Sequence, residues 1–262
     1  MRLPPSVARL GLQLRPRVPD PIWRGLLELG SLVTDAPTIG LPDFRRVLVL
    51  APHPDDETIG CGGTLALLAD GGARVEVLLA TDGEATIGPA LPASEIARRR
   101  RAETVTALEL LGVDTAPRCL GLPDGDLVHH GRILTASVQE AIDDLHPDLV
   151  LSPWLLEAHP DHRALAHALA RTEPSRDLQV WGYEAHTPVI ATQVVGITDV
   201  IDRKRAALAA HGTAAEAFDL EATLGLNRWR SLATDQGRGL AEAFHTATWD
   251  DYISRAALVP LR

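Results

Sequence analysis

The chain has 262 residues, of which 45% are hydrophobic, and it carries a net charge of −10. This length and composition predict one large α/β domain, or one domain with small additions. The acidic balance disfavours nucleic acids and anionic membranes as partners, and no apolar run reaches the ~20 residues that a membrane span needs.

The cysteine content and the N-terminal sequence indicate the cellular compartment of the protein. The chain has two cysteines, Cys61 and Cys119, which exclude a disulfide framework and a zinc site built on thiolates. The first residues lack the continuous apolar segment of a secretory signal. We therefore expect a cytoplasmic protein.

Residues 1–42 are predicted to form an N-terminal appendage to a main domain over residues 43–262. Seven prolines in the appendage prevent long regular elements, so that only a short amphipathic helix is predicted, over residues 22–33. We expect the appendage to pack on the main domain or on another subunit, which would allow a homo-oligomer.

From residue 45 onwards, apolar strands alternate with helical segments. Strands are predicted over residues 47–51, 75–80, 118–120, 149–152, 178–183 and 194–197. Helices are predicted over residues 58–70, 94–111, 132–145, 162–171, 201–211 and 239–244, with Ser94 as the N-cap of the second. Strands that are apolar throughout and alternate with helices predict an α/β fold, with a mostly parallel sheet and helices on both faces.

Polar clusters follow four of these predicted strands. HPDDE occupies residues 53–57 after the first strand, and TDGE occupies residues 81–84 after the second. Asp124 follows the third strand, and HPDH occupies residues 159–162 after the strand at 149–152. Because ligands of parallel sheets bind beyond the carboxyl ends of the strands, the four clusters predict a single site on that rim.

The residue types on this rim are those of a catalytic metal site. His53, Asp56 and His162 would supply two imidazoles and one carboxylate, a set that leaves a position for water. A divalent metal held there would lower the pKa of that water. Asp55 would be a spare carboxylate beside the metal, able to accept the water proton during attack on a carbonyl.

The remaining polar residues on the rim are candidates for supporting roles. His159 could stabilise an oxyanion or donate a proton to a leaving amine, with Asp161 fixing its tautomer. Glu84, Asp124 and Arg100 are candidate substrate-binding residues. Asp124 would serve equally well as a turn residue, and Arg100 could instead pair with a neighbouring glutamate or cover a helix face. Lys204, the only lysine, is expected at the surface.

The motifs also resemble a known family. HPDDE followed by TIGCGGTLA, the TDGE loop, the LPDG turn at residues 122–125 and HPDH are similar to motifs of the PIG-L/LmbE-like zinc-dependent de-N-acetylases, and the resemblance runs from about residue 45 to 244. It implies a Rossmann-like α/β fold and hydrolysis of an N-acyl group from an amino sugar, such as an N-acetylglucosaminyl conjugate. It implies Zn²⁺ ligation by His53, Asp56 and His162, with Asp55 as general base and His159, supported by Asp161, as acid or oxyanion stabiliser.

Several alternatives stay open at this point. The substrate could be a thiol precursor, an antibiotic intermediate or a cell-wall fragment, or the chain could be an amidase acting on a thiol S-conjugate. Fe²⁺ or Co²⁺ could replace Zn²⁺ on such ligands. A non-catalytic sugar-binding protein is a further possibility. A nucleotide-binding loop at Gly60–Gly63 is disfavoured because the carboxylates before it would repel a pyrophosphate.

Overall fold

The computed structural model describes residue 19 and residues 36–87, 90–174 and 177–259. The helix predicted over residues 22–33 lies outside the described residues. The strands are β1 (Thr38–Ile39), β2 (Arg46–Ala51), β3 (Arg74–Thr81), β4 (Arg118–Leu122), β5 (Leu149–Pro153), β6 (Gln179–Tyr183), β7 (Gln193–Gly196) and β8 (Ala241–Thr248). The helices are α3 (Asp56–Asp70), α4 (Ala93–Leu111), α5 (Gly131–Leu145), α6 (Pro160–Leu169), α7 (Ile201–Ala210), α8 (Gly212–Ala215), α9 (Ala222–Arg230), α10 (Leu232–Asp235) and α11 (Trp249–Ala256), with 3₁₀ turns at Leu127–His130 and Thr198–Val200.

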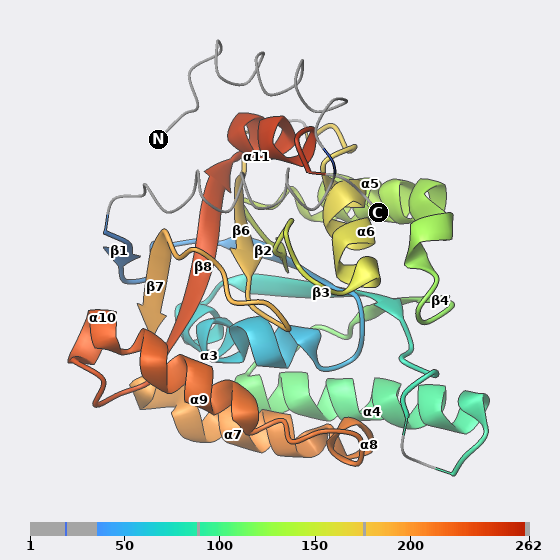
Figure 1. Ribbon diagram of the computed structural model, residues 1–262, viewed down its shortest axis with the longest axis horizontal. Coiled ribbons are helices and arrows are strands. Elements are labelled where there is room, and N and C mark those ends of the chain that lie inside the picture. The colour runs from blue at the N-terminus through green and yellow to red at the C-terminus, as the bar shows by residue number, and fades with distance from the viewer. Residues whose placement is uncertain (1–18, 20–35, 88–89, 175–176, 260–262) are drawn as a thin grey trace.

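The strands form one mixed sheet in the order β1-β7-β8-β6-β5-β2-β3-β4 (Figure 1). Strand β8 runs antiparallel to both of its neighbours, β6 and β7, and the other pairs are parallel. The prediction of a mostly parallel α/β sheet with helices around it is therefore confirmed. The strands β5, β2, β3 and β4 are adjacent, so their carboxyl ends meet along one rim.

Two local predictions are wrong. The helix predicted over residues 239–244 is the start of β8, because pairing with β6 and β7 overrides the helical preference of its alanines and glutamate. Ser94 is not an N-cap, since α4 begins at Ala93 with Pro92 in the capping position and no side-chain cap.

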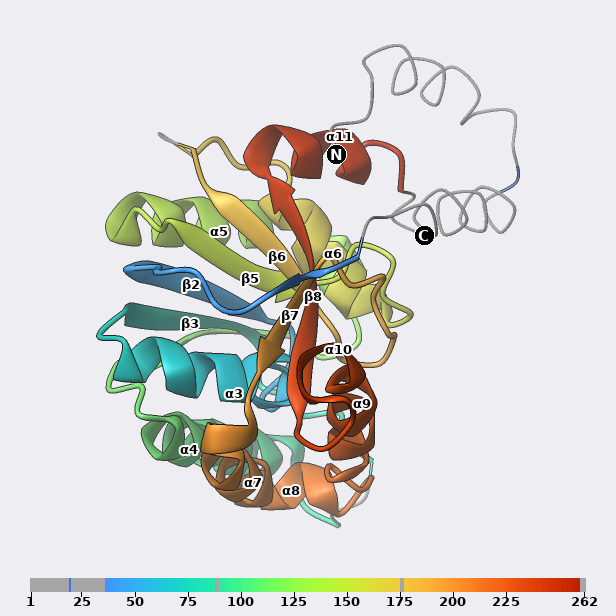
Figure 2. The same ribbon diagram turned by 90° about the vertical axis from the view of Figure 1, so that its left-hand side faces the viewer.

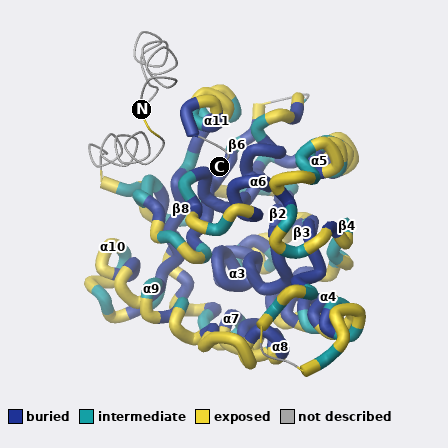
Figure 3. The backbone as a smooth tube through the Cα atoms, turned by 45° about the vertical axis from the view of Figure 1, so that its right-hand side comes forward, coloured by how far each residue is buried: buried dark blue, intermediate teal, exposed yellow. Residues whose placement is uncertain are grey.

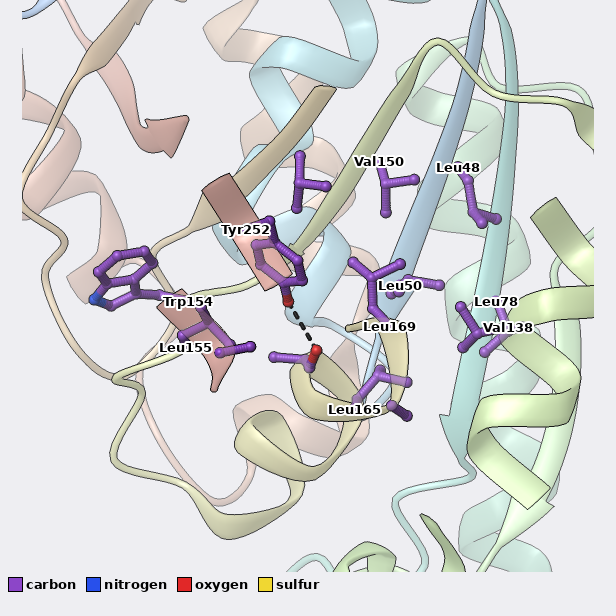
Figure 4. Close-up of a cluster of buried hydrophobic side chains, with 14 of the residues drawn as sticks. Leu48, Leu50, Leu78, Val138, Val150, Trp154, Leu155, Leu165, Leu169 and Tyr252 are labelled. Atoms are coloured by element: carbon purple, nitrogen blue, oxygen red, sulfur yellow. Dashed lines mark hydrogen bonds between the residues drawn. The ribbon is translucent and has the colours of Figure 1, made fainter. Parts of the chain in front are cut away.

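Helices cover both faces of the sheet (Figure 2), and each face carries its own hydrophobic core. On β2, Val47 and Val49 point towards α3, α4 and α7, whereas Leu48 and Leu50 point towards α5 and α6. Figure 3 shows the central strands, among them β2, β3 and β8, and α3 as the most deeply buried parts of the chain, whereas β4 is only partly buried. Figure 4 shows the second core, where the Tyr252 hydroxyl of α11 donates to the Ala166 carbonyl of α6 at 2.8 Å.

Helix α3 lies unusually close to the sheet. A Cβ at Gly60 would lie 2.3 Å from the Tyr183 ring of β6, and one at Gly63 would lie 2.6 Å from Ile197. Any side chain at these positions would push the helix outwards, since real Cβ contacts are not this short. Close packing thus accounts for the glycines at both positions without a bound phosphate.

A buried ion pair between Glu242 and Lys204 binds the backbone of α3. The helix is kinked at Cys61, which leaves the amides of Gly63 and Thr64 at the start of a new helical stretch. Glu242 of β8 accepts from these two amides at 2.8 and 2.7 Å and from Lys204 Nζ at 2.6 Å. Lys204 also donates to the Ile59 carbonyl at 2.9 Å and is fully buried, so the prediction that it lies at the surface is wrong.

Among the described residues, every helix is too short or too polar to cross a membrane. The cytoplasmic location stays a prediction.

Candidate active site

The four polar clusters meet on the rim formed by the carboxyl ends of β5, β2, β3 and β4. HPDDE connects β2 to α3, and HPDH begins α6, with His159 as its N-cap. Asp55, Asp56, Asp161 and His162 are buried, and His53 is only 9% exposed. Buried polar groups in this number need compensating partners, so their contacts define what the rim can do.

One carboxylate oxygen of Asp56 faces two imidazoles. Its Oδ2 lies 3.1 Å from His53 Nδ1 and 3.3 Å from His162 Nε2. Burial alone would raise the pKa of Asp56, but the neighbouring His162 and His53 hold it well below its usual range. The three side chains predicted to bind a metal are therefore together, around an ionised carboxylate.

His162 has the environment of a metal ligand. The ring is fully buried, and neither nitrogen makes a hydrogen bond within the described part of the chain. Nδ1 lies 3.7 Å from Glu157 Oε2, and Nε2 faces Asp56. Burial tends to lower the pKa of His162, but the Asp56 charge raises it to about 9, so the ring attracts a positive charge. A cation between these ligands would take the place of that proton, and a His₂Asp donor set suits zinc.

Asp55 occupies a strained backbone position next to this group. Its φ is 127°, which is rare for a residue other than glycine, and its amide donates to Glu57 Oε2 at 3.2 Å. Burial raises the pKa of Asp55 to about 7, although the guanidinium of Arg100, 2.9 Å away, lowers it. The carboxylate is thus poised to exchange a proton near neutral pH.

Arg100 is buried beneath Asp55 and is not open to a ligand. Only 4% of the residue is exposed. Besides Asp55, it donates to the Pro54 carbonyl, to the Gly83 carbonyl at 3.0 Å and to Thr86 Oγ1 at 2.6 Å. Arg100 therefore ties the loop after β3 to the loop after β2 and fixes the side chain of Asp55 between them.

The Asp161 carboxylate lies against His53, and its contact with His159 is made by the backbone. Its Oδ2 is 3.2 Å from His53 Nε2 and accepts from the Gly125 amide at 2.8 Å, while Oδ1 accepts from Leu127 at 3.0 Å. The Asp161 amide donates to His159 Nδ1 at 3.2 Å. A neutral His159 ring therefore carries its proton on Nε2. Burial and the nearby His53 and His162 lower the pKa of His159 to about 4, so the ring is neutral at neutral pH.

The remaining predicted residues join the loops after β3 and β4. Asp124 Oδ1 lies 3.1 Å from His53 Nε2, so this residue does more than form a turn. Glu84 Oε1 accepts from the Asp124 amide at 2.9 Å, and Asp124 Oδ2 accepts from the Ala85 amide at 3.1 Å. Two carboxylates, Asp124 and Asp161, thus face the side of His53 that points away from Asp56, an arrangement that orients a ligating imidazole.

Sequence reasoning missed three residues near this group. His186, in the loop after β6, has its ring 5.2 Å from that of His162. Glu157 is fully buried beside His162. His211 is fully buried with Nε2 3.4 Å from Glu57 Oε1. The rim argument would have found His186, because it follows a predicted strand, whereas His211 lies at the C-terminal end of α7 and the same argument does not reach it.

Comparison with known proteins agrees with this geometry. Residues 48–172 match the family described as GlcNAc-PI de-N-acetylase, PIG-L. The chain is 34% identical over 191 residues to the diacetylchitobiose deacetylase of Thermococcus kodakarensis, a match that covers 64% of this chain and 70% of that one. It is 32% identical over 223 residues to a protein of Bacillus cereus named as a probable N-acetyl-alpha-D-glucosaminyl L-malate deacetylase 2, over 79% of this chain and 99% of that one.

A solved structure extends the likeness to three dimensions. The N,N′-diacetylchitobiose deacetylase of Pyrococcus horikoshii superposes with a TM-score of 0.65 at 28% identity, over 80% of this chain and 86% of that one. The polar rim lies mainly within the matched segment, which holds both the HPDDE and the HPDH clusters. The chain belongs to the PIG-L family of GlcNAc-PI de-N-acetylases.

Proposed function

We propose that the protein is a metal-dependent hydrolase that removes the N-acetyl group from an N-acetylglucosaminyl conjugate. The observation that carries this proposal is the single Asp56 oxygen within 3.3 Å of nitrogens of both His53 and His162, beside a carboxylic acid whose pKa is about 7. Relatives are named as deacetylases of diacetylchitobiose and of N-acetylglucosaminyl malate, which supports the same substrate class.

His53, Asp56 and His162 would hold the metal. Bound there, a Zn²⁺ ion would act as a Lewis acid on the acyl carbonyl and would acidify a water molecule. Asp124 and Asp161 contribute by orienting His53 from its other nitrogen. Fe²⁺ and Co²⁺ suit the same donor set, so the native metal has to be measured.

Asp55 would move the proton. With a pKa of about 7, a large fraction of this carboxylate is ionised at neutral pH and can accept a proton from the attacking water. The water oxygen bonds to the acyl carbon, the carbon–nitrogen bond breaks, and Asp55 returns the proton to the departing amine. Arg100 would hold the carboxylate in position for both transfers.

His159 would stabilise the oxyanion. Because its Nδ1 accepts from the Asp161 amide, the neutral ring presents an Nε2–H donor. A pKa of about 4 argues against a protonated His159 in the resting enzyme, so we assign it a hydrogen bond to the carbonyl oxygen as charge develops there. Glu84 and Asp124, on the loops after β3 and β4, remain candidate substrate-binding residues.

The test is release of acetate or free amine from a panel of substrates by metal-stripped enzyme, with and without added Zn²⁺, Fe²⁺ or Co²⁺. The panel should contain diacetylchitobiose, N-acetylglucosaminyl malate, N-acetylglucosaminyl inositol and a thiol S-conjugate amide. We expect metal-dependent turnover on at least one amino-sugar member. Cleavage of the S-conjugate alone would support the amidase alternative, and stoichiometric metal without any turnover would support a binding protein.

A further inference from the structure

We propose that His186 is a fourth, displaceable protein ligand of the ion that Asp56 and His162 would hold. This inference rests on the proposed function, because it concerns the same metal. It adds a residue from the loop after β6 to a site that otherwise draws on the loops after β2 and β5.

The position of the ring supports ligation. One ligand atom each from Asp56, His162 and His186 lie within 4.8 Å of one another. Two ligands of one tetrahedral zinc ion lie about 3.3–3.6 Å apart, given metal–ligand distances of about 2.0–2.2 Å. Asp56 Oδ2 and His162 Nε2 already have this separation, at 3.3 Å. The His186 ring therefore needs to close by at most about 1.5 Å to share an ion with them, a shift within the reach of an exposed side chain.

The loop that carries His186 is held from both ends. Glu184 Oε1 accepts from the Val189 amide at 2.8 Å, and Arg230 of α9 donates both to Glu184, from Nε to Oε2 at 3.2 Å, and to the Val189 carbonyl at 2.6 Å. These contacts bracket the loop at residues 184 and 189. The buried arginine–carboxylate pair resists opening, because separating it would leave a charge without a partner.

The middle of the loop is fastened to the HPDH side of the site. The His186 amide donates to Glu157 Oε2 at 3.1 Å, and Thr187 Oγ1 accepts from the Ala158 amide at 2.9 Å. The same Glu157 oxygen faces His162 Nδ1. The backbone of His186 is thus fixed beside an expected ligand, and its side chain is directed to the site by structure on both sides.

Exposure explains why the fourth ligand would be displaceable. His53, Asp56 and His162 are buried, so water could not readily hydrate any of these side chains if it left the metal. His186 is exposed, so its imidazole can return to water at little cost. Four protein ligands close a zinc site and three leave it open, so exchange of His186 for a substrate oxygen would open the site only when substrate is present.

Zinc-edge X-ray absorption tests the inference without using activity. Protein loaded with one equivalent of Zn²⁺ should show three imidazoles around the metal, and His186→Ala should show two. Competition with a chromophoric chelator should give at least ~10-fold weaker zinc binding for His186→Ala, since even outer contacts of metal ligands contribute 10–100-fold. His129→Ala, which removes another exposed histidine, should match the wild type in both measurements.

Each outcome decides a different claim. Two imidazoles in the wild type, or unchanged zinc affinity in His186→Ala, would overturn the role of His186 and leave the proposed function intact. Failure of the wild type to bind zinc, iron or cobalt stoichiometrically would overturn both. Saturating acetate, the product, should lower the count in the wild type from three imidazoles to two, and three imidazoles under acetate would show that His186 is not displaced.

Discussion

Two clusters of buried charge lie on opposite sides of the kink in α3, and they differ in how their charges are satisfied. On the C-terminal side of the kink, Glu242 accepts hydrogen bonds from Lys204 and from two backbone amides, all within 2.8 Å. On the rim, one Asp56 oxygen faces both His53 and His162. The ring nitrogens of the buried His162 make no hydrogen bonds in the described part of the chain. The charges of the first cluster satisfy one another, whereas the second leaves buried ligand atoms for the metal ion proposed above.

This difference gives a physical criterion for separating structural from functional charge. A buried ion pair that satisfies every donor and acceptor fixes the packing of the elements it joins. A group of buried carboxylates and imidazoles whose ligand atoms converge on one point is instead a candidate binding site for an ion or a ligand. Three substitutions test this criterion, and a fourth tests a buried histidine outside both clusters.

The largest effect is expected for His162→Ala. It removes one of the two histidines that face Asp56, so the variant should lose stoichiometric metal and fall below detectable deacetylation. Metal content by elemental analysis and acetate release on the best substrate measure this. His167→Gln, on the same helix α6, should keep its metal. A fully metallated, active His162→Ala would remove this residue from the ligand set.

Asp55→Asn should separate proton transfer from metal binding. We expect kcat to fall by roughly 10²–10⁴, as it does when a general base is lost, with metal content unchanged. The amide can still accept from Arg100, so the local backbone should be kept. Metal content and steady-state kinetics measure the two effects, with Asp126→Asn on the surface as a control. Loss of metal together with activity would place Asp55 in the ligand set instead.

Lys204→Met tests the buried cluster around Glu242. Removing one partner of a fully buried pair leaves Glu242 with an uncompensated charge, so the free energy of unfolding should fall by about 3–5 kcal/mol. Arg118→Met, which removes a partly exposed partner of Asp144, should change it by less than about 1 kcal/mol. Denaturant midpoints measure both. Equal effects from the two variants would refute a structural role specific to the buried pair.

The smallest effect is a pH dependence that arises outside both clusters, at His167. Burial and the charges of Arg171 and Arg163 lower the pKa of His167 to about 4, while the unfolded chain binds this proton near pH 6.5. Between these values the unfolded state holds more protons, so stability falls as pH falls from about 6.5 to about 4. His167→Gln should reduce that loss by about 1–3 kcal/mol, measured as the difference in unfolding free energy between pH 7 and pH 4.5. An unchanged pH dependence would show that His167 does not titrate in this range.

The rim could be predicted from the sequence because strand periodicity and polar clusters are local patterns. The apolar runs located β2, β3 and β5 to within two residues, and parallel pairing then brought the residues after them together. HPDDE and HPDH could be assigned to one site for the same reason. The family resemblance rests on the same short segments.

The errors have the opposite origin, in contacts between distant parts of the chain. The segment that starts β8 reads as a helix because the neighbours that make it a strand, β6 and β7, lie far away in sequence. Lys204 reads as a surface residue because its partner, Glu242, is 38 residues away. Asp161 was expected behind its near neighbour His159, whereas its carboxylate reaches His53 across the sheet.

The close approach of α3 to the sheet has a consequence for how this fold can change its substrate. Gly60 meets the buried Tyr183 ring and Gly63 meets Ile197, so α3, which begins with Asp56, is held close to the sheet at these two contacts. Changes in the loops around the rim would therefore leave the position of α3 unaltered. The two glycines would thereby keep the catalytic side chains in place while the loops that select the substrate change.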